Sequence, residues 1–383
     1  MATIGIDVTA LYTPASGGIG TSQYQTLRAL SELDTPHRFV MYAAKPPVVP
    51  FSDEPLDVPF ELRLGSGFTA RSNILWMQTG VNRLLAADGV DLVWGPRHLL
   101  PFRARSVARV ATIHDLWHAH FPGQQPPINR ALNRALIGRI LKVADHIVTM
   151  SQATADDVVS IYQVAPDRMT VVPLGVDTSV FRPASPARVE ELRARLGLPE
   201  RYLLSLDVFN PRKNFRVVLE AFALLPQEKL AELQVVGIGR RRATSNSVDP
   251  YAVATSLGVS DRVRILDDVD HDDLVTLYSG ALAFIYPSVY EGFGMPVLEA
   301  MACGCPVVAS NRSSLPEVAG DAGVLVDPEN ADAVAAAVLR LASSPSETAG
   351  LVERGIERAS EFTWRRTAEG MLVVFDRVLE RRT

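Results

Sequence analysis

The stretch from Tyr286 to Ala302, YPSVYEGFGMPVLEAMA, decides the fold of the chain. An apolar run from Ala281 to Tyr286 leads into it, and the length of that run and the proline that follows predict a buried strand opening into a loop. Gly292 and Gly294 allow close approach of the backbone, and Pro296 stands where the first turn of a helix would begin. Open α/β sheets bind ligands in loops at the carboxyl ends of their strands, and the first N–H groups of a helix suit an anion. We therefore expect a binding site at this turn.

Two carboxylates flank the turn, Glu291 in the loop and Glu299 in the helix, with seven residues between them. An ionised carboxylate only accepts hydrogen bonds, so the pair suits a ligand with neighbouring hydroxyls, such as a sugar or a ribose. The alternative is that Glu299 is a solvated helix residue and Glu291 a loop charge. The glycines, the proline and the preceding strand favour the binding site.

Strand-like and helix-like runs alternate along the whole chain, which predicts parallel sheets covered by helices. At 383 residues the chain is long enough for two domains, and the non-periodic segment 177–188, DTSVFRPASPAR, has the composition of an interdomain linker. We predict domains over 1–183 and 184–362 and a last helix over 363–383. The predicted strands lie within 2–8, 37–43, 58–64, 90–95, 108–115, 146–150, 168–176, 201–209, 233–239, 262–267, 282–286, 305–310 and 322–328.

Composition narrows the class of protein. With 47% hydrophobic and 21% charged residues the chain is of the ordinary globular kind, and it has no apolar run of about 18 residues that could span a membrane. The start, MATIGIDVTAL, lacks the pattern of a secretory signal, so we expect a cytoplasmic protein. The net charge of −5 argues against a nucleic-acid partner. Cys303 and Cys305 lack a second ligand pair, which favours small buried residues over a zinc site.

Residues 290–328 resemble the donor-binding half of retaining glycosyltransferases of family four, which have the GT-B fold. The two glutamates, the GFGMP turn and the PEV of Pro316 to Val318 are specific in combination. The resemblance implies two Rossmann-like domains with a cleft between them, the first receiving the acceptor and the second holding a nucleotide-sugar donor. It also implies that the last helix crosses back to the first domain, and that the enzyme needs no metal and no cofactor besides its co-substrate.

The implied reaction moves a hexose from a nucleotide-diphosphate sugar to an acceptor hydroxyl with retention. SNRSSLPEV and PRKN are most similar to mannosyltransferase-type members, so we expect GDP-mannose as donor and a glycan, lipid-linked or small-molecule acceptor. The setting would be the synthesis of a cell-surface polysaccharide or glycolipid.

The same resemblance implies roles for residues of the second domain. Glu299 would hold the ribose and Glu291 the donor sugar, while Lys213, in PRKN after a predicted strand, would bind the diphosphate with Arg212 beside it. Many members have a Gly-Arg pair at the end of that strand, whereas Asp207 and Val208 stand here. The other residues expected at the donor are those of the turn: Gly292, Phe293, Gly294, Met295 and Pro296.

The first domain offers two further candidates. SGGIG, residues 16–20, follows the first strand, and the resemblance places Gly18 and Gly20 near the donor phosphates, the alternative being a plain turn. His114 follows the apolar strand of ATIHD and could donate to a sugar hydroxyl or to charge that develops in the transition state. The resemblance favours His114 over His118 and His120, which could equally be surface residues.

Other functions remain open. One is a sugar-nucleotide epimerase of the same architecture, and another is a sugar-nucleotide-binding protein without catalysis. A phosphorylase would need a Schiff-base lysine, yet Lys229 is the last lysine of the chain. The acids of DDVDHDD, residues 267–273, contain a D-x-D but are predicted to open a helix and complement its dipole.

A basic segment suggests a membrane partner. Residues 97–142 hold eight basic residues and one acid, Asp115. The helical run INRALNRALIGRILK brings Arg130, Arg134, Arg139 and Lys142 close together. We expect peripheral contact with the anionic inner face of the membrane, the alternative being a solvated face above a sheet-packing stripe. The residues of that stripe would be Leu132, Leu136, Ile140 and Val143.

Overall fold

The computed structural model describes residues 1–12, 17–50, 54–65, 72–124, 126–226, 228, 230, 232–240, 249–267 and 269–382. The chain forms two compact units, Met1–Gly175 with Thr363–Thr383, and Val176–Phe362. The first unit ends at Gly175, before the division that the linker composition suggested near 183, and the last helix belongs to this unit. We describe each unit by itself and call them unit 1 and unit 2.

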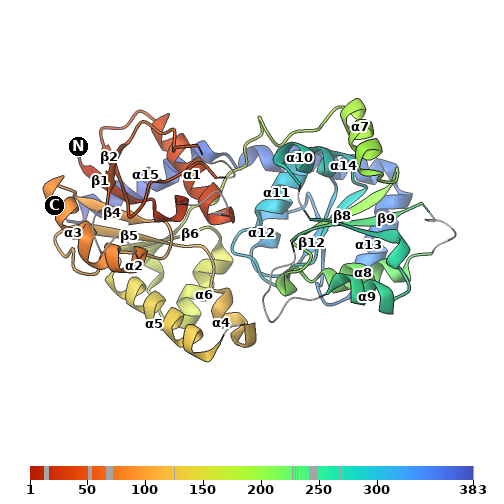
Figure 1. The fold of residues 1–383 in the computed structure, drawn as a ribbon, viewed down its shortest axis with the longest axis horizontal. Helices are drawn as coiled ribbons and strands as arrows, with labels where there is room; N and C mark the ends of the chain where they lie inside the picture. Colours follow the sequence, from red (N-terminus) through yellow and green to blue (C-terminus); the bar gives the residue numbers. More distant parts are fainter. Residues whose placement is uncertain are drawn as a thin grey trace. The chain divides into compact units, whose positions relative to one another are not determined.

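Unit 1 is built on a parallel seven-stranded sheet in the order β3-β2-β1-β4-β5-β6-β7 (Figure 1). Its central strands are buried on both faces, which is why their sequences are continuous apolar runs and do not alternate. The strands are β1 (Thr3–Asp7), β2 (Arg38–Ala43), β3 (Glu61–Leu64), β4 (Leu92–Gly95), β5 (Ala108–Ile113), β6 (His146–Thr149) and β7 (Met169–Val171).

Helices cover both faces of this sheet (Figure 1). On one face α1 packs against α15, whose Phe375 contacts Trp94 of β4. On the other face, residues of α3, α5 and α6 share a core with β2, β4, β5 and β6. The helices are α1 (Gly17–Ser31), α2 (Asn73–Leu75), the π-helical turn η3 (Trp76–Gly80), α3 (Val81–Ala87), α4 (Trp117–His120), α5 (Pro127–Val143), α6 (Gln152–Tyr162) and α15 (Trp364–Glu380), with 3₁₀ turns at Thr9–Leu11, Pro122–Gln124 and Pro166–Arg168.

Helix α15 shows why a segment so far along the chain packs in unit 1. Thr363 caps it by accepting from the N–H of Arg366, and its buried residues recur every three or four positions, which gives one apolar stripe. The hydroxyl of Thr367 also donates to the carbonyl of Pro173, just after β7, at 2.8 Å. The stripe and this bond hold α15 on the sheet.

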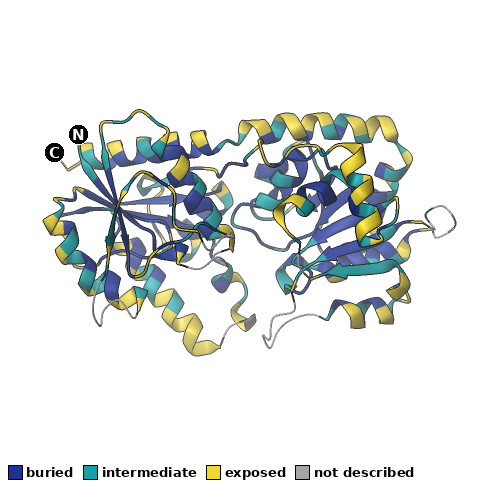
Figure 2. Cartoon of the chain, turned by 45° about the horizontal axis from the view of Figure 1, so that its top comes forward, coloured by how far each residue is buried: buried dark blue, intermediate teal, exposed yellow. Residues whose placement is uncertain are grey.

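Unit 2 has a parallel six-stranded sheet in the order β10-β9-β8-β11-β12-β13. In both units the central strands lie in the dark blue buried interior and the helices expose their outer sides (Figure 2). The strands are β8 (Tyr202–Leu206), β9 (Gln234–Ile238), β10 (Val263–Leu266), β11 (Ala283–Tyr286), β12 (Val307–Ser310) and β13 (Val324–Val326).

The helices of unit 2 also form two layers (Figure 1). Helices α8, α9 and α13 share one core with the sheet, whereas α7 packs on α10 and α11 on α14 at the other face. The helices are α7 (Pro186–Leu196), α8 (Phe215–Leu224), α9 (Pro250–Ser256), α10 (His271–Gly280), α11 (Met295–Ala302), α12 (Leu315–Ala319), α13 (Ala331–Ser343) and α14 (Pro345–Glu361), with 3₁₀ turns η6 (Pro211–Lys213) and η7 (Ser260–Arg262).

The predicted fold class is confirmed, because each predicted strand contains one of the observed strands and all named strands pair in parallel. Asp270 caps α10, and Asp272 and Asp273 lie in its first turn, as predicted for the acids of DDVDHDD; Asp268 lies outside the described residues. Cys303 and Cys305 are buried and unoxidised, as predicted.

The alternative interpretation of α5, a stripe packed on the sheet, holds only in part. Ile140 is buried, and Leu136 and Val143 pack against the core, but Leu132 is exposed, whereas Ile137 and Leu141 are buried. The buried residues of the helix all lie in its second half.

Candidate active site

The strand order of unit 2 places its topological switch point between β8 and β11. From β8 the chain continues to β9 on one side, whereas β11 is followed by β12 and β13 on the other. The loops that leave neighbouring strands β8 and β11 therefore diverge, and such a switch point is where open α/β sheets bind ligands. Lys213 follows β8 and Glu291 follows β11, so the two predicted residues flank this point.

The turn that carries Lys213 has a strained backbone held by side chains. Asp207 and Asn214 both adopt positive φ, near 53° and 52°, a conformation that Asp and Asn tolerate better than most residues. Asn210 binds Asp207 at 2.8 Å and accepts from the N–H of Arg212 at 3.2 Å. Asp207, which replaces the glycine of many family members, is thus part of the turn that presents Lys213.

Lys213 and Glu291 form a buried ion pair. The ammonium Nζ lies 2.6 Å from Glu291 Oε1, and only about a tenth of each side chain is exposed, 11% and 10%. Tyr286 OH and Ser288 Oγ also donate to this oxygen, at 2.9 Å and 2.7 Å. Burial alone would raise the pKa of Glu291, but the charges of Lys213 and Arg212 outweigh it and hold that pKa below its ordinary value. The site therefore holds a fixed cation beside an ionised carboxylate.

Serine side chains that follow β12 hold the loop that carries Glu291. Ser313, at φ 55°, and Ser314 donate to the carbonyl of Glu291 at 2.6 Å and 3.0 Å, and Ser314 Oγ also lies 2.7 Å from the carbonyl of Phe293. These serines belong to the SNRSS segment after β12. Three neighbouring strands therefore contribute to one site.

The GFGMP turn joins this loop to α11. Gly294 has φ 109°, and a Cβ there would lie 2.5 Å from Leu315 Cδ2, so only glycine fits. Pro296 lies in the first turn of α11, as predicted. The ring of Phe293 is buried against Phe362, so its side chain serves the core, while Gly292, Met295 and Pro296 are partly exposed.

Glu299 lies one turn further along α11 and is partly exposed. Tyr278 donates to its Oε2 at a long 3.4 Å. Burial raises the pKa of Glu299 from 4.5 to about 7, and the bond from Tyr278 opposes that rise only in part. The one long bond from Tyr278 does not offset the burial of this carboxylate, so Glu299 has capacity to accept hydrogen bonds from the hydroxyls of a ligand.

This raised pKa predicts a pH dependence of stability. Between pH 4.5 and about 7 the folded protein keeps a proton that the unfolded chain has lost, so stability should fall as the pH rises through this window. At about 1.4 kcal/mol per pKa unit the loss amounts to roughly 3 kcal/mol. Urea denaturation at pH 5 and pH 8 measures it. Glu299→Gln should remove this part of the fall in stability with pH, and the control Glu353→Gln, at an exposed position, should keep it. An equal fall in the wild type and both variants would contradict the assignment.

In unit 1, His114 follows the carboxyl end of β5 and is tied to the loop after β4. Its Nε2 lies 2.6 Å from the carbonyl of Pro96, which can only accept, so Nε2 carries a proton. His98, at φ 47°, accepts the backbone N–H of His114 at 2.9 Å. Burial lowers the pKa of His114, which keeps the ring neutral and leaves Nδ1 as an acceptor. The sequence predicted that His114 donates to the substrate, but its one ring N–H already donates to the carbonyl of Pro96.

The predicted glycine turn lies at the start of α1. Gly17 has φ 62°, and no described atom lies within 4 Å of the position that a Cβ on Gly18 would take. Gly20 is buried in the helix, and Ser16 lies outside the described residues. Gly18 thus borders open space, whereas Gly20 serves packing.

Family models match both halves of the chain. The model described as Glycosyltransferase Family 4 matches residues 16–180, and that described as Glycosyl transferases group 1 matches residues 189–358. O-antigen chain mannosyltransferase B of Escherichia coli is 34% identical over 280 residues, which cover 72% of each chain. The chain belongs to glycosyltransferase family 4.

Other relatives of this glycosyltransferase carry related names. MMP alpha-(1->4)-mannosyltransferase of Mycolicibacterium hassiacum is 35% identical over 247 residues, 63% of this chain and 56% of its own. D-inositol 3-phosphate glycosyltransferase 1 of Catenulispora acidiphila is 29% identical over 413 residues, 99% of this chain and 96% of its own.

Solved structures share the fold of this glycosyltransferase. Sucrose-phosphate synthase from Thermosynechococcus elongatus superposes with a TM-score of 0.79 at 22% identity and full coverage of both chains. Anabaena HepE in complex with UDP and glucose has a TM-score of 0.72 at 17% identity, covering 98% of this chain and 100% of its own. The GT-B fold is confirmed.

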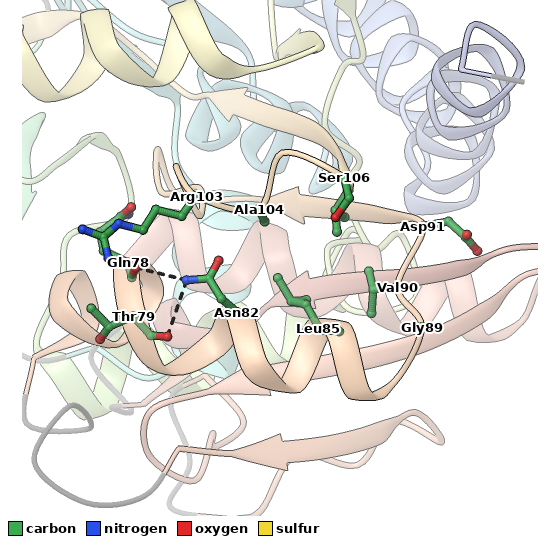
Figure 3. Close-up of a pocket in the computed structure, with 12 residues that line it drawn as sticks. Gln78, Thr79, Asn82, Leu85, Gly89, Val90, Asp91, Arg103, Ala104 and Ser106 are labelled. Atoms are coloured by element: carbon green, nitrogen blue, oxygen red, sulfur yellow. Dashed lines mark hydrogen bonds between the residues drawn. The ribbon is translucent and has the colours of Figure 1, made fainter.

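A cavity of about 710 Å³ lies elsewhere in unit 1 of the glycosyltransferase (Figure 3). Its lining includes Gly89 to Asp91 and Ser106 to Val107, which directly precede β4 and β5, so it opens at the amino ends of strands. Figure 3 shows Arg103 and Gln78 at one end and Asp91 at the other. His114 follows the carboxyl end of β5, so this cavity is separate from the candidate site.

The predictions from sequence did not include Tyr286 and Ser288 beside the ion pair of unit 2, nor Pro96 and His98 beside His114 in unit 1. Tyr286 was counted only as the last residue of a buried strand, although a tyrosine hydroxyl needs a partner when buried. Within the described residues no group of three or more His, Cys, Asp or Glu side chains is placed to hold a metal ion.

Proposed function

We propose that this enzyme transfers a hexose from a nucleotide-diphosphate sugar to an acceptor hydroxyl with retention of configuration. The observation that carries this is the buried pair of Lys213 and Glu291 at the switch point of unit 2. A diphosphate needs a cation, and a sugar needs an acceptor for its hydroxyls, and this pair offers both side by side. Unit 2 would hold the donor and unit 1 the acceptor.

The geometry supports a division of tasks in the donor site. Lys213 would meet the diphosphate as a point charge, with the guanidinium of Arg212 beside it. Glu291 would accept from a hydroxyl of the donor sugar, and Glu299 from the ribose. The turn from Gly292 to Pro296 would bring backbone against the donor.

The donor we favour is GDP-mannose. Two relatives are named mannosyltransferases, one of them for the O-antigen chain, which also favours a cell-surface polysaccharide or glycolipid as the product. The rival functions are a sugar-nucleotide-binding protein without catalysis and a sugar-nucleotide epimerase.

A thermal-shift panel of GDP-, UDP-, ADP- and TDP-sugars, followed by product analysis, tests this proposal. A donor at one hundred times its dissociation constant should stabilise the protein by about 2.7 kcal/mol. Release of nucleoside diphosphate with a glycosylated product supports transfer. Binding with neither transfer nor hydrolysis would favour the binding protein, and an altered sugar still attached to its nucleotide would favour the epimerase.

Glu299→Ala is expected to weaken binding of the free nucleoside diphosphate by roughly 1.5 to 3 kcal/mol, the range for a hydrogen bond to a charged group. The physical reason is the loss of a carboxylate that the ribose hydroxyls would satisfy. Calorimetric titration measures the change, with the exposed Glu353→Ala as control. Unchanged affinity would remove Glu299 from the ribose site.

We also propose that the acceptor is presented at an anionic membrane surface. Ile128 and Leu132 of α5 are 69% and 63% exposed, and Arg130 and Arg134 are exposed in the same N-terminal half of the helix. A helix that exposes both apolar and basic side chains suits the boundary between headgroups and acyl chains. Within the described residues, no helix has both the length and the apolar character to cross a bilayer.

Binding to anionic vesicles should therefore occur at low salt and fall steeply as salt is added. Each basic residue near the surface contributes about 1 kcal/mol, and the Debye length shrinks from about 10 Å at 0.1 M to about 3 Å at 1 M salt. Vesicle sedimentation measures this. Arg130→Gln with Arg134→Gln should abolish the binding, and the distant exposed Arg365→Gln should preserve it. Equal retention by neutral and anionic vesicles would contradict the proposal.

A further inference from the structure

Tyr286 bonds to both members of the buried ion pair. Its hydroxyl accepts from Lys213 Nζ at 2.5 Å and donates to Glu291 Oε1 at 2.9 Å. A phenol has one proton and can both donate and accept, so these two bonds use its proton and one lone pair. Tyr286 is therefore the one described side chain seen to bond to both charges of the pair.

The bonds around Glu291 converge on a single oxygen. Lys213, Tyr286 and Ser288 all donate to Oε1, and none of the described residues donates to Oε2. An oxygen that receives three donors has no capacity left for a ligand. Oε2 is then the atom of this carboxylate that can accept from a substrate hydroxyl.

The ring of Tyr286 is held rigidly. It is the last residue of β11, it is 1% exposed, and it stacks on Phe284 with centroids 5.2 Å apart. Burial and the neighbouring Glu291 charge raise the pKa of the phenol well above its ordinary value, so it keeps its proton.

We propose that Tyr286 is a positioning residue for the donor site, which holds Lys213 in place for a diphosphate and turns Glu291 so that Oε2 faces the sugar. The proposal rests on the function proposed above. Without the hydroxyl, the ammonium loses one acceptor and the carboxylate one donor, and the flexible lysine side chain is free to leave its place. Both tasks of the pair should then suffer together.

Tyr286→Phe tests the proposal, with Tyr202→Phe as a matched control. Tyr202 is also 1% exposed and lies on neighbouring β8, but its hydroxyl donates to the carbonyl of Leu277 at 2.7 Å, away from the pair. Both variants remove one buried hydroxyl and should lower the unfolding midpoint similarly. Only Tyr286→Phe should weaken nucleoside diphosphate binding, at least threefold, and lower kcat/KM for the nucleotide sugar at least tenfold.

A double-mutant cycle separates positioning from a general loss of structure. If Tyr286 acts through Lys213, Tyr286→Phe should weaken nucleotide binding by less than a factor of 1.5 in a Lys213→Met background. The control Tyr202→Phe should have the same effect on binding in the wild-type and Lys213→Met backgrounds. The probe is whichever of GDP, UDP, ADP and TDP binds the wild-type protein most tightly. In a second cycle, Tyr286→Phe should likewise have little effect on kcat/KM when Glu291→Gln is already present.

The outcomes distinguish this inference from the proposed function. Wild-type protein that binds none of the four nucleotides overturns the proposed function, and this inference with it. Wild-type binding with Tyr286→Phe indistinguishable from Tyr202→Phe, or with the same fold-loss in the wild-type and Lys213→Met backgrounds, overturns the role of Tyr286 alone.

Discussion

Lys213→Met should destabilise the protein and weaken donor binding at the same time. Its side chain and that of Glu291 are only 11% and 10% exposed, so removing the cation leaves a buried carboxylate without its charge partner. Breaking a buried ion pair in this way costs about 3 to 5 kcal/mol of unfolding free energy. The diphosphate would lose its cation as well.

The two effects can be separated with a second substitution. Lys213→Met with Glu291→Gln should regain much of the stability, because a neutral amide needs no counter-charge, but it should not regain nucleotide affinity. Urea denaturation and calorimetry measure the two quantities, and the exposed Lys45→Met serves as control. A stable Lys213→Met variant with normal affinity would show that the pair neither supports the fold nor binds the donor.

His114→Ala is expected to lower the turnover number by about 10² to 10⁴, the usual contribution of a positioned acid or base. Donor affinity should stay the same, because the proposed donor residues belong to unit 2 and His114 to unit 1. A group that acts in the transition state lowers kcat without changing ground-state binding. The neutral ring with its proton on Nε2 offers Nδ1 as an acceptor for a hydroxyl proton.

Two further variants make this test specific. His114→Gln can still donate to the carbonyl of Pro96 and should retain more activity than His114→Ala. His120→Ala alters a histidine that pairs with Asp157 at 2.9 Å and should leave turnover unchanged. An equal loss of donor affinity in His114→Ala would make His114 a ground-state ligand, and unchanged turnover would remove it from the reaction.

The strand-to-helix turn from Tyr286 to Ala302 was predictable because the features that build it are local. An apolar run, a glycine at φ 109° and a proline in the first turn of α11 each act on their own few residues. The parallel sheets were predictable for the same reason, since strands buried on both faces give continuous apolar runs.

The sequence by itself determined the thirteen strands of the described residues, the acidic start of α10 and the turn into α11, and it singled out Lys213, Glu291, Glu299 and His114 as candidates. Only the tertiary structure decided which partners each of them has. Lys213 and Glu291 are 78 positions apart in the chain, and no local pattern predicts that they share a hydrogen-bond network with Tyr286. His114 donates its ring N–H to the carbonyl of Pro96, 18 positions earlier, and Leu132 of α5 is exposed whereas Ile137 and Leu141 are buried. Periodicity records which face of an element is apolar, whereas the partner of a buried polar atom depends on which strands lie side by side.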